Sequence, residues 1–185
     1  AEGLDHLIFA AKRNVDVTTI VHDNRVYGLT TGQYTPTSPS GFAGRSTPEG
    51  LEVSPINPLE MVFASGGTFI ARGYSNRIDL LKETIREAIL HRGFSFVDVL
   101  QVCATFFNMY DLYNRRTYAL EEHDPQDVVQ AQAKMVEWDY NSDGPIPLGI
   151  FHRRAAPTFG DNFEKFNSKI PDLEGKVRRV LKGYI

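Results

Sequence analysis

A β-branched segment that runs directly into a polar, glycine-bearing turn is the feature that most constrains this chain. Residues 17–21 read Val-Thr-Thr-Ile-Val, a composition that favours a buried β-strand. The polar segment 23–28 follows at once, and open α/β sheets bind their ligands at the carboxyl ends of such strands. The sequence therefore predicts a strand that ends at a ligand site, although the local sequence alone favours an ordinary turn that leaves a sheet.

This turn offers oxygen atoms that suit a hard cation. Asn24 carries a neutral amide oxygen, and the backbone carbonyl of Val26 lies two residues further along the chain. Mg²⁺ takes oxygen ligands and usually shares them with a phosphate group. Asn24 and Val26 are therefore candidate ligands of a magnesium ion that holds a phosphorylated cofactor.

The same segment carries a resemblance to a known family. Residues 23–33 read Asp-Asn-Arg-Val-Tyr-Gly-Leu-Thr-Thr-Gly-Gln, and Thr-Pro-Thr follows at 35–37. This resembles the second half of the thiamine-diphosphate motif in the β subunits of 2-oxoacid:ferredoxin oxidoreductases. Residues 3–6, Gly-Leu-Asp-His, are similar to the segment that follows the Gly-Asp-Gly half of that motif. The resemblance continues through Cys103 to residues 143–153, so it covers nearly the whole chain.

The resemblance implies both a fold and an activity. The fold is α/β, a parallel sheet flanked by helices that forms the C-terminal part of a thiamine-diphosphate-binding domain. Residues 1–120 belong to that domain, whose N-terminal part is missing, and residues 121–185 form a C-terminal extension. The activity is oxidative decarboxylation of a 2-oxoacid to an acyl-CoA, with electrons passing through a [4Fe-4S] cluster to ferredoxin.

The family also implies the cofactors, the partners and the site residues. The cofactors are thiamine diphosphate, Mg²⁺ and the cluster, with coenzyme A as co-substrate. The partners are an α subunit, with γ and δ subunits as further candidates, and ferredoxin. His6 is the one candidate for a catalytic role, because it is the only histidine close to the motif and belongs to the family's Asp-His pair. The glutamate that activates the cofactor belongs, in this family, to the partner subunit. Asn24 and Val26 hold the Mg²⁺, and four residues lie near the diphosphate and the substrate: Gly28, Leu29, Thr30 and Thr31. Thr31 brings no positive charge for a second carboxylate, which argues against 2-oxoglutarate.

Cys103, the single cysteine, follows a predicted buried strand. A lone cysteine in such a position is most often a small core residue. The resemblance instead makes Cys103 the fourth thiolate of the [4Fe-4S] cluster, with the other three on an N-terminal segment that this sequence lacks. Two departures from the family pattern stand beside it: Val102 replaces a usual proline, and Asn108 comes one residue late.

Two other functions fit part of these observations. A thiamine-dependent, non-oxidative 2-oxoacid decarboxylase would share the Asn24 to Gly28 turn without needing Cys103. A non-catalytic interaction subunit would fit a chain that carries only half of the cofactor motif. Iron and thiamine content distinguish the three.

Composition excludes several other classes. The formal net charge of -3 and a pI near 6.0 give no electrostatic basis for binding nucleic acid or an anionic membrane. No apolar run is long enough to span a bilayer. One cysteine fits a reducing, cytoplasmic setting. Because Ala1 is not an initiating Met and a helix begins almost at once, we expect the chain to be the C-terminal part of a longer protein.

Capping residues and periodicity predict the remaining elements. Helices are expected after Asn57, after Asn76 and after Asp124, strands at 68–72, 94–100 and 146–151, and a long loop at 34–58 over the cofactor mouth or a partner. Pro147 suggests an edge strand, and His152 is expected on the surface. Residues 155–185 are expected to wrap the domain or reach a neighbouring subunit. The helix after Asn76 is expected to bury Ile78, Leu81, Ile85 and Ile89. The helix after Asp124 is expected to bury Val128, Val129, Ala133 and Val136.

Overall fold

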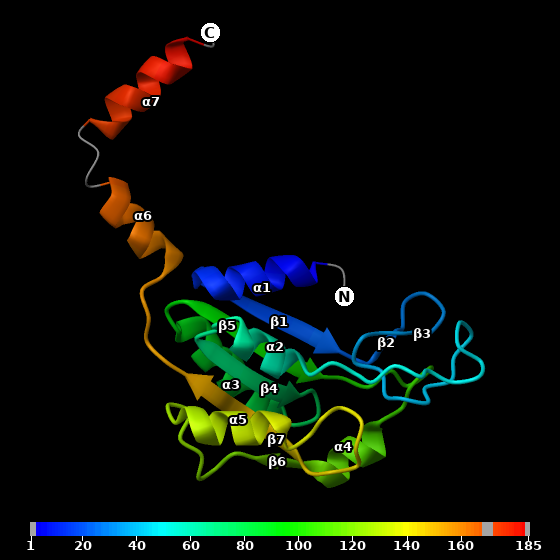
Figure 1. The fold of residues 1–185 in the computed structure, drawn as a ribbon. Coiled ribbons are helices and arrows are strands. Elements are labelled where there is room, and N and C mark those ends of the chain that lie inside the picture. The colour runs from blue at the N-terminus through cyan, green and yellow to red at the C-terminus, as the bar shows by residue number, and fades with distance from the viewer. Residues whose placement is uncertain (1–2, 168–171, 184–185) are drawn as a thin grey trace.

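A computed structural model describes residues 3–167 and 172–183 (Figure 1). The sheet lies between helices, and α6 and α7 lead away from this body at the C-terminal end (Figure 1). In chain order the elements are α1 (Leu4–Arg13), β1 (Val17–Asp23), β2 (Val26–Tyr27), β3 (Gln33–Tyr34), α2 (Pro58–Ala64), β4 (Phe69–Tyr74), α3 (Ile78–Leu90), β5 (Phe94–Leu100), α4 (Tyr110–Arg116), β6 (Thr117–Ala119), α5 (Val128–Val136), β7 (Ile146–Arg153), α6 (Phe159–Asn167) and α7 (Leu173–Lys182).

The main sheet has the strand order β1-β5-β4-β7-β6. Strands β1, β5 and β4 are parallel, β7 runs antiparallel to β4, and β6 runs parallel to β7. All residues of β5 and β4 are buried, as expected for strands covered on both faces. The predicted α/β fold with a mostly parallel sheet is confirmed. The predicted strand β7 is antiparallel to β4, and the short strands β2, β3 and β6 were not predicted.

Two packed layers cover the sheet. On one face, Phe94 and Phe96 of β5 pack with α1, α2 and α5, which contribute Ala11, Leu59 and Met135 to the same cluster. On the other face, residues at the alternate positions of β4 and β5 pack with α3 through Ala88. Successive strand residues therefore face opposite helical layers, which is the period-two pattern of a doubly covered sheet.

The predicted start of α2 is confirmed in detail. The Asn57 side-chain oxygen accepts a hydrogen bond from the backbone N–H of Leu59 at 3.1 Å, and Pro58 is the first helical residue. The Asn57 amide also donates to the carbonyl of Met135 at 2.8 Å. One cap therefore closes α2 and ties it to α5.

The inward face predicted for α3 is wrong at both ends. Ile78 is 65% exposed and Ile89 is 63% exposed, whereas Thr84 and Ala88 are buried. The helix lies close to the sheet, because the carbonyl of Ala88 accepts a hydrogen bond from Ser95 Oγ at 2.8 Å. Small residues permit that approach, so they occupy the contact in place of isoleucine.

Two other helix predictions are corrected in the same way. Arg77, and not Asn76, precedes the first turn of α3, and the Asn76 amide donates instead to Asn114 Oδ1 at 2.8 Å. In α5 the buried residues are Ala131 and Met135. All four predicted inward residues are exposed: Val128, Val129, Ala133 and Val136.

Strand β7 corrects two further expectations. It lies between β4 and β6, so Pro147 is not on an edge strand. The pairing with β4 ends at Gly149, so no N–H is required of Pro147 on that side. His152 is 3% exposed and packs edge-on against Phe63, with ring centroids 5.1 Å apart, so it is a buried residue and not a surface one.

The long loop is confirmed, since residues 35–57 contain no helix and no strand. It folds back over the polar turn, where Phe42 and Leu51 bury the side chain of Val26. In the part of the chain that the structure describes, no helix is long and apolar enough to cross a membrane.

Candidate cofactor site

Two neighbouring parallel strands deliver the candidate residues to one edge of the sheet. In the β1–β5 register, Asp23 lies opposite Leu100. The backbone N–H of Gln101 donates to the carbonyl of Asp23 at 2.9 Å, which keeps the two chains side by side as they leave the sheet. Asn24 and Cys103 therefore follow the carboxyl ends of adjacent strands, the position where α/β sheets bind ligands.

A cleft of about 680 Å³ opens at this edge. Its walls come from α1, the end of β1, the polar turn and the start of the long loop. Five of the predicted site residues line it: Asn24, Val26, Gly28, Leu29 and Thr30. Thr31, His6 and Cys103 are not part of its lining.

Asn24 is held in a fixed orientation by its own turn. Its side-chain oxygen accepts a hydrogen bond from the backbone N–H of Val26 at 3.1 Å. An amide oxygen has a second lone pair, so Asn24 can still coordinate a cation. Within the described residues no group of three or more His, Cys, Asp or Glu side chains could hold a metal. A cation here would accordingly depend on neutral protein oxygens and on the phosphates of a ligand, which is the ligand set that suits Mg²⁺.

Gly28 allows the polar turn and Cys103 to approach each other closely. A Cβ atom at Gly28 would lie 3.2 Å from Cys103 Sγ and 3.3 Å from Asn24 Nδ2. Gly32 shows the same relation, because a Cβ there would lie 2.5 Å from Phe106 Cδ1. Both glycines therefore leave room for the segment that follows β5, hereafter the Cys103 loop (residues 101–109).

Gln33 holds the far end of the turn. Its side-chain oxygen accepts hydrogen bonds from Thr30 Oγ1 at 2.5 Å and from the backbone N–H of Thr31 at 3.2 Å. Leu29 is fully exposed at the tip. Residues 28–30 of the turn thus line the cleft, and the Gln33 side chain fixes the shape of the turn.

His6 lies on the exposed side of α1. Its side chain is 90% exposed, and its Nε2 is 3.9 Å from Asp5 Oδ2. Gly3, Leu4 and Leu7 of the same segment line the cleft, whereas His6 does not. The helical spacing places His6 off the face that Leu4 and Leu7 share.

Behind the cleft, a buried charge cluster was not foreseen from the sequence. Asp98 and Arg72 are completely buried, with Arg72 Nε 3.5 Å from Asp98 Oδ2. Tyr140 OH donates to Asp98 Oδ2 at 2.5 Å, and an Arg72 amino group donates to Tyr140 OH at 3.0 Å. Burial, reinforced by the neighbouring carboxylate of Asp23, raises the pKa of Asp98 to about 7. The sequence feature that could have revealed this cluster is the presence of Arg72 and Asp98 inside otherwise apolar strands.

Asp23 links this cluster to the polar turn. One carboxylate oxygen accepts hydrogen bonds from Thr37 Oγ1 at 2.7 Å and from the backbone N–H of Arg25 at 3.0 Å. Burial raises the pKa of Asp23, and the hydrogen bonds from Thr37 and Arg25 act against that increase. The turn that carries Asn24 therefore starts from a buried, hydrogen-bonded carboxyl group.

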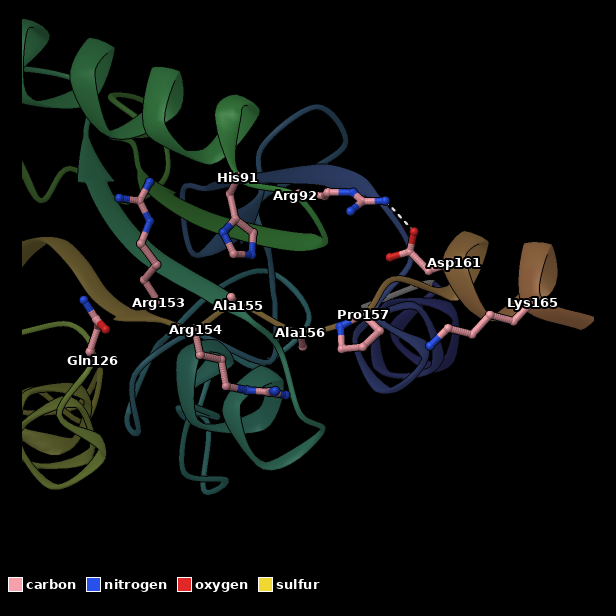
Figure 2. Close-up of a pocket in the computed structure, with 10 residues that line it drawn as sticks. All are labelled: His91, Arg92, Gln126, Arg153, Arg154, Ala155, Ala156, Pro157, Asp161 and Lys165. Carbon is pink, nitrogen blue, oxygen red and sulfur yellow. Dashed lines mark hydrogen bonds and ion pairs between the residues drawn. The ribbon is translucent and has the colours of Figure 1, made fainter.

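A larger cleft of about 830 Å³ lies at the opposite, amino-terminal edge of β4 and β5 (Figure 2). It is rich in cations, but Arg153 pairs with Glu87 at 2.7 Å, Arg154 donates to the carbonyl of Gly66 at 2.9 Å, and Arg92 pairs with Asp161. Its basic groups are largely engaged within the chain, and it lies at the edge where parallel sheets do not bind ligands. The cleft beside Asn24 is the better candidate.

Comparison with known families agrees with this geometry. Residues 2–99 match the family described as thiamine pyrophosphate enzyme, C-terminal TPP binding domain. Residues 103–168 match a second family, described as the C-terminal part of the pyruvate ferredoxin oxidoreductase beta subunit. The first match places the chain in the class of thiamine pyrophosphate enzymes.

Curated relatives and a solved structure narrow the class. The 2-oxoacid:ferredoxin oxidoreductase subunit beta of Saccharolobus solfataricus is 39% identical over 82% of this chain and 53% of that relative. The 2-oxoglutarate synthase subunit KorB of Methanothermobacter marburgensis is 38% identical over 100% of this chain and 63% of that relative. A 2-oxoglutarate:ferredoxin oxidoreductase structure from Magnetococcus marinus, with 2-oxoglutarate, coenzyme A and succinyl-CoA bound, matches 96% of this chain and 62% of its own with a TM-score of 0.86 and 29% identity.

The chain belongs to the family of 2-oxoacid:ferredoxin oxidoreductase β subunits. It spans between one half and two thirds of the length of the relatives described above.

Proposed function

We propose that this chain supplies the β-subunit half of the active site of a 2-oxoacid:ferredoxin oxidoreductase. The complex would oxidatively decarboxylate a 2-oxoacid, transfer the acyl group to coenzyme A and pass the electrons through a [4Fe-4S] cluster to ferredoxin. The observation that carries the proposal is the close approach of Cys103 to the polar turn at Gly28, where a Cβ would lie 3.2 Å from Sγ. A cofactor turn beside a potential cluster ligand suits a redox enzyme better than a non-oxidative decarboxylase.

The chain's own residues have distinct roles at the cofactor. Asn24 Oδ1 and the carbonyl of Val26 would hold the Mg²⁺, with the remaining ligands from the diphosphate and from outside this chain. Gly28, Leu29 and Thr30 would place backbone groups at the diphosphate, and Thr31 would lie towards the substrate. Thiamine diphosphate, when bound, supplies the nucleophilic carbon that attacks the ketone of the 2-oxoacid. The apolar residues that line the cleft, such as Leu7 and Phe96, would exclude water from it.

Cys103 would supply one of the four thiolates of the cluster. The chain contains a single cysteine, so the other three must come from elsewhere. Cys103 is a free, partly exposed thiol, which is compatible with an external metal cluster. His6, on the exposed side of α1, remains a hypothesis for a catalytic role.

The family supports the proposed partners, and the single cysteine supports the proposed location. An α subunit, ferredoxin and coenzyme A are proposed partners, with γ and δ subunits as further candidates, and a cytoplasmic location is expected. The substrate is a 2-oxoacid; an absence of charge at Thr31 argues against 2-oxoglutarate, although some relatives carry that substrate in their names. The division of the chain at residue 120 into cofactor domain and extension stays a prediction.

The Mg²⁺ assignment is tested by Asn24→Ala in the complex that contains this chain. We expect the variant to lose most of its affinity for Mg²⁺–thiamine diphosphate, measured by isothermal titration calorimetry, while its far-ultraviolet circular dichroism is unchanged. Asn108→Ala is the matched control, because Asn108 forms a similar local turn with the N–H of Tyr110 but does not line the cleft. Equal cofactor affinity in the two variants would contradict the assignment.

A further inference from the structure

Arg25 lies between the two proposed Mg²⁺ ligands and has an unusual backbone. Its φ is 61°, in the left-handed region that non-glycine residues seldom adopt. The conformation is held from both sides, since its N–H donates to Asp23 Oδ1 at 3.0 Å and its carbonyl accepts from Ser38 Oγ at 2.5 Å. A strained residue that its surroundings fix in this way is a feature of functional sites.

The Arg25 side chain is almost fully buried, with 2% exposure. Its Nε donates to the carbonyl of Thr37 at 2.7 Å, and a terminal amino group donates to the carbonyl of Tyr140. The guanidinium also lies over the rings of Phe107, Trp138 and Tyr140, at 5.6, 5.4 and 5.9 Å from their centroids. One side chain therefore contacts the long loop, the C-terminal extension and the Cys103 loop.

Phe107 connects this guanidinium to Cys103. The N–H of Phe107 donates to the carbonyl of Cys103 at 3.0 Å, and the two residues form an antiparallel bridge. The Phe107 ring packs edge-on against Phe42, with centroids 5.3 Å apart. The position of Cys103 is accordingly tied to a ring that Arg25 contacts directly.

We propose that Arg25 is a positioning residue that couples the cofactor turn to the Cys103 loop. Binding at Asn24 and Val26 from the cleft side shifts the residue between them, and the already fixed Arg25 side chain transmits that shift through Phe107 to the thiol. The coupling is reciprocal, because two sites that share one positioning element bias each other equally. This inference rests on the proposed function, since it requires Mg²⁺–thiamine diphosphate in the cleft.

The test measures the reactivity of the Cys103 thiol in the assembled complex after the iron has been removed anaerobically by chelation. Alkylation by iodoacetamide is followed by mass spectrometry of the peptide that contains Cys103, with and without saturating Mg²⁺–thiamine diphosphate. In the wild-type complex we expect the cofactor to slow alkylation by at least about fivefold, the lower end of typical allosteric coupling.

Arg25→Lys retains the charge but loses the planar fork that spans Thr37 and Tyr140. In this variant we expect saturating cofactor to slow the alkylation of Cys103 by less than about twofold. We count coupling that small as lost. Val97→Ala is the control, because Val97 is buried on the opposite face of the sheet, in the cluster packed against α3. It should lower thermal stability and leave the protection factor unchanged.

Phe107→Leu provides a second test that leaves the Arg25 hydrogen bonds in place, and it carries the test if Arg25→Lys does not fold. It should bind Mg²⁺–thiamine diphosphate with near wild-type affinity and still lose the protection of Cys103. Protection that persists in both variants would indicate direct shielding of the thiol by the cofactor and would overturn the inference. A wild-type complex that binds the cofactor without any change in alkylation would also overturn it while leaving the proposed function intact. Failure of the wild-type complex to bind the cofactor would overturn both.

Discussion

Cys103 is the residue at which a structural and a functional role differ most. It packs with Phe107 against the apolar group of Val26, Phe42 and Leu51, as a core cysteine would. It also approaches the polar turn at Gly28, as a cluster ligand beside an electron donor would. Both roles require a thiol at this position, so the two are distinguished only by whether the thiolate binds iron.

Replacing Cys103 with serine separates the two roles. If Cys103 is a cluster ligand, the harder oxygen binds iron weakly, and the cluster should be lost or degraded while Mg²⁺–thiamine diphosphate still binds at Asn24 and Val26. Electron paramagnetic resonance of the reduced complex, with iron and acid-labile sulfide analysis, measures this. A cluster signal of full strength would assign Cys103 to packing alone, and Cys103→Ser would then change only the stability of the fold.

Asp98 should make folding stability depend on pH. Its pKa is about 7 in the native state, against an ordinary value of 3.8. Between these values the native protein holds a proton that the unfolded chain has released, so the free energy of unfolding falls as pH rises through this window. The slope is at most about 1.4 kcal/mol per pH unit, and the loss is complete above pH 7.

The Asp98→Asn variant removes this titration but keeps an oxygen that can accept the hydrogen bond from Tyr140. We expect the wild-type protein to lose more stability than the variant between pH 5 and pH 7, measured by urea unfolding. Parallel pH profiles for the two proteins would contradict a proton held on Asp98.

At the residue scale, the sequence identified those cleft-lining residues that belong to one contiguous motif. Asn24, Val26 and Gly28 are recognisable because their spacing is local and the turn chemistry is specific. Arg25 and Asp98 were missed because their importance depends on neighbours such as Tyr140, which is 115 residues from Arg25 and 42 from Asp98. The local sequence around a charged residue does not show which distant residue will pack against it in the folded protein.

At the scale of elements, types and approximate bounds were predictable, but the orientation of two helices was not. Capping at Asn57 and the β-rich composition of residues 94–100 are local signals, and both elements formed where expected. The inward face of α3 instead followed close packing on the sheet, so the small residue Ala88 replaced the larger Ile89 at the contact. The pattern of hydrophobic residues alone does not show how close a helix packs to the sheet.

The dual role of Asn57 leads to a prediction about α2. Asn57→Ala removes both the helix cap and the hydrogen bond to the carbonyl of Met135, and we expect a loss of about 2 kcal/mol in the free energy of unfolding. Asn57→Ser is the matched variant, because its hydroxyl keeps a cap acceptor and its shorter side chain loses the hydrogen bond to Met135. Urea unfolding should place Asn57→Ser between the wild-type protein and Asn57→Ala. Equal losses in the two variants would show that the cap itself contributes nothing measurable.

At the scale of the whole molecule, the C-terminal segment divides into an integrated part and a projecting part. Strand β7 pairs with β4 inside the sheet, and Phe151 is fully buried in the main core. Helix α7 lies beyond α6, away from the sheet (Figure 1). The ion pairs of α7 within the described residues are internal, Arg178 with Glu174 and Arg179 with Asp172.

This division predicts opposite results for two changes in the same segment. Ending the chain after Asn167, which removes α7, should shift the thermal midpoint by less than about 2 °C. Phe151→Ala should lower the free energy of unfolding by about 3–5 kcal/mol through the cavity that it leaves. Differential scanning calorimetry measures both, and a large destabilisation on removal of α7 would show that this helix packs on the body.

The bond between Arg25 and the carbonyl of Tyr140 also has a consequence for biosynthesis. Chains emerge from the ribosome N-terminus first, and contacts between distant residues must wait for the later partner. The polar turn is synthesised early, yet the carbonyl that anchors its arginine belongs to a residue made 115 positions later. A growing chain therefore carries the proposed cofactor ligands long before it can hold them in place. We expect thiamine diphosphate and magnesium to be captured only after Tyr140 has been synthesised and has folded against Arg25, and translation that stops before Tyr140 should yield a product that carries the motif and does not retain the cofactor.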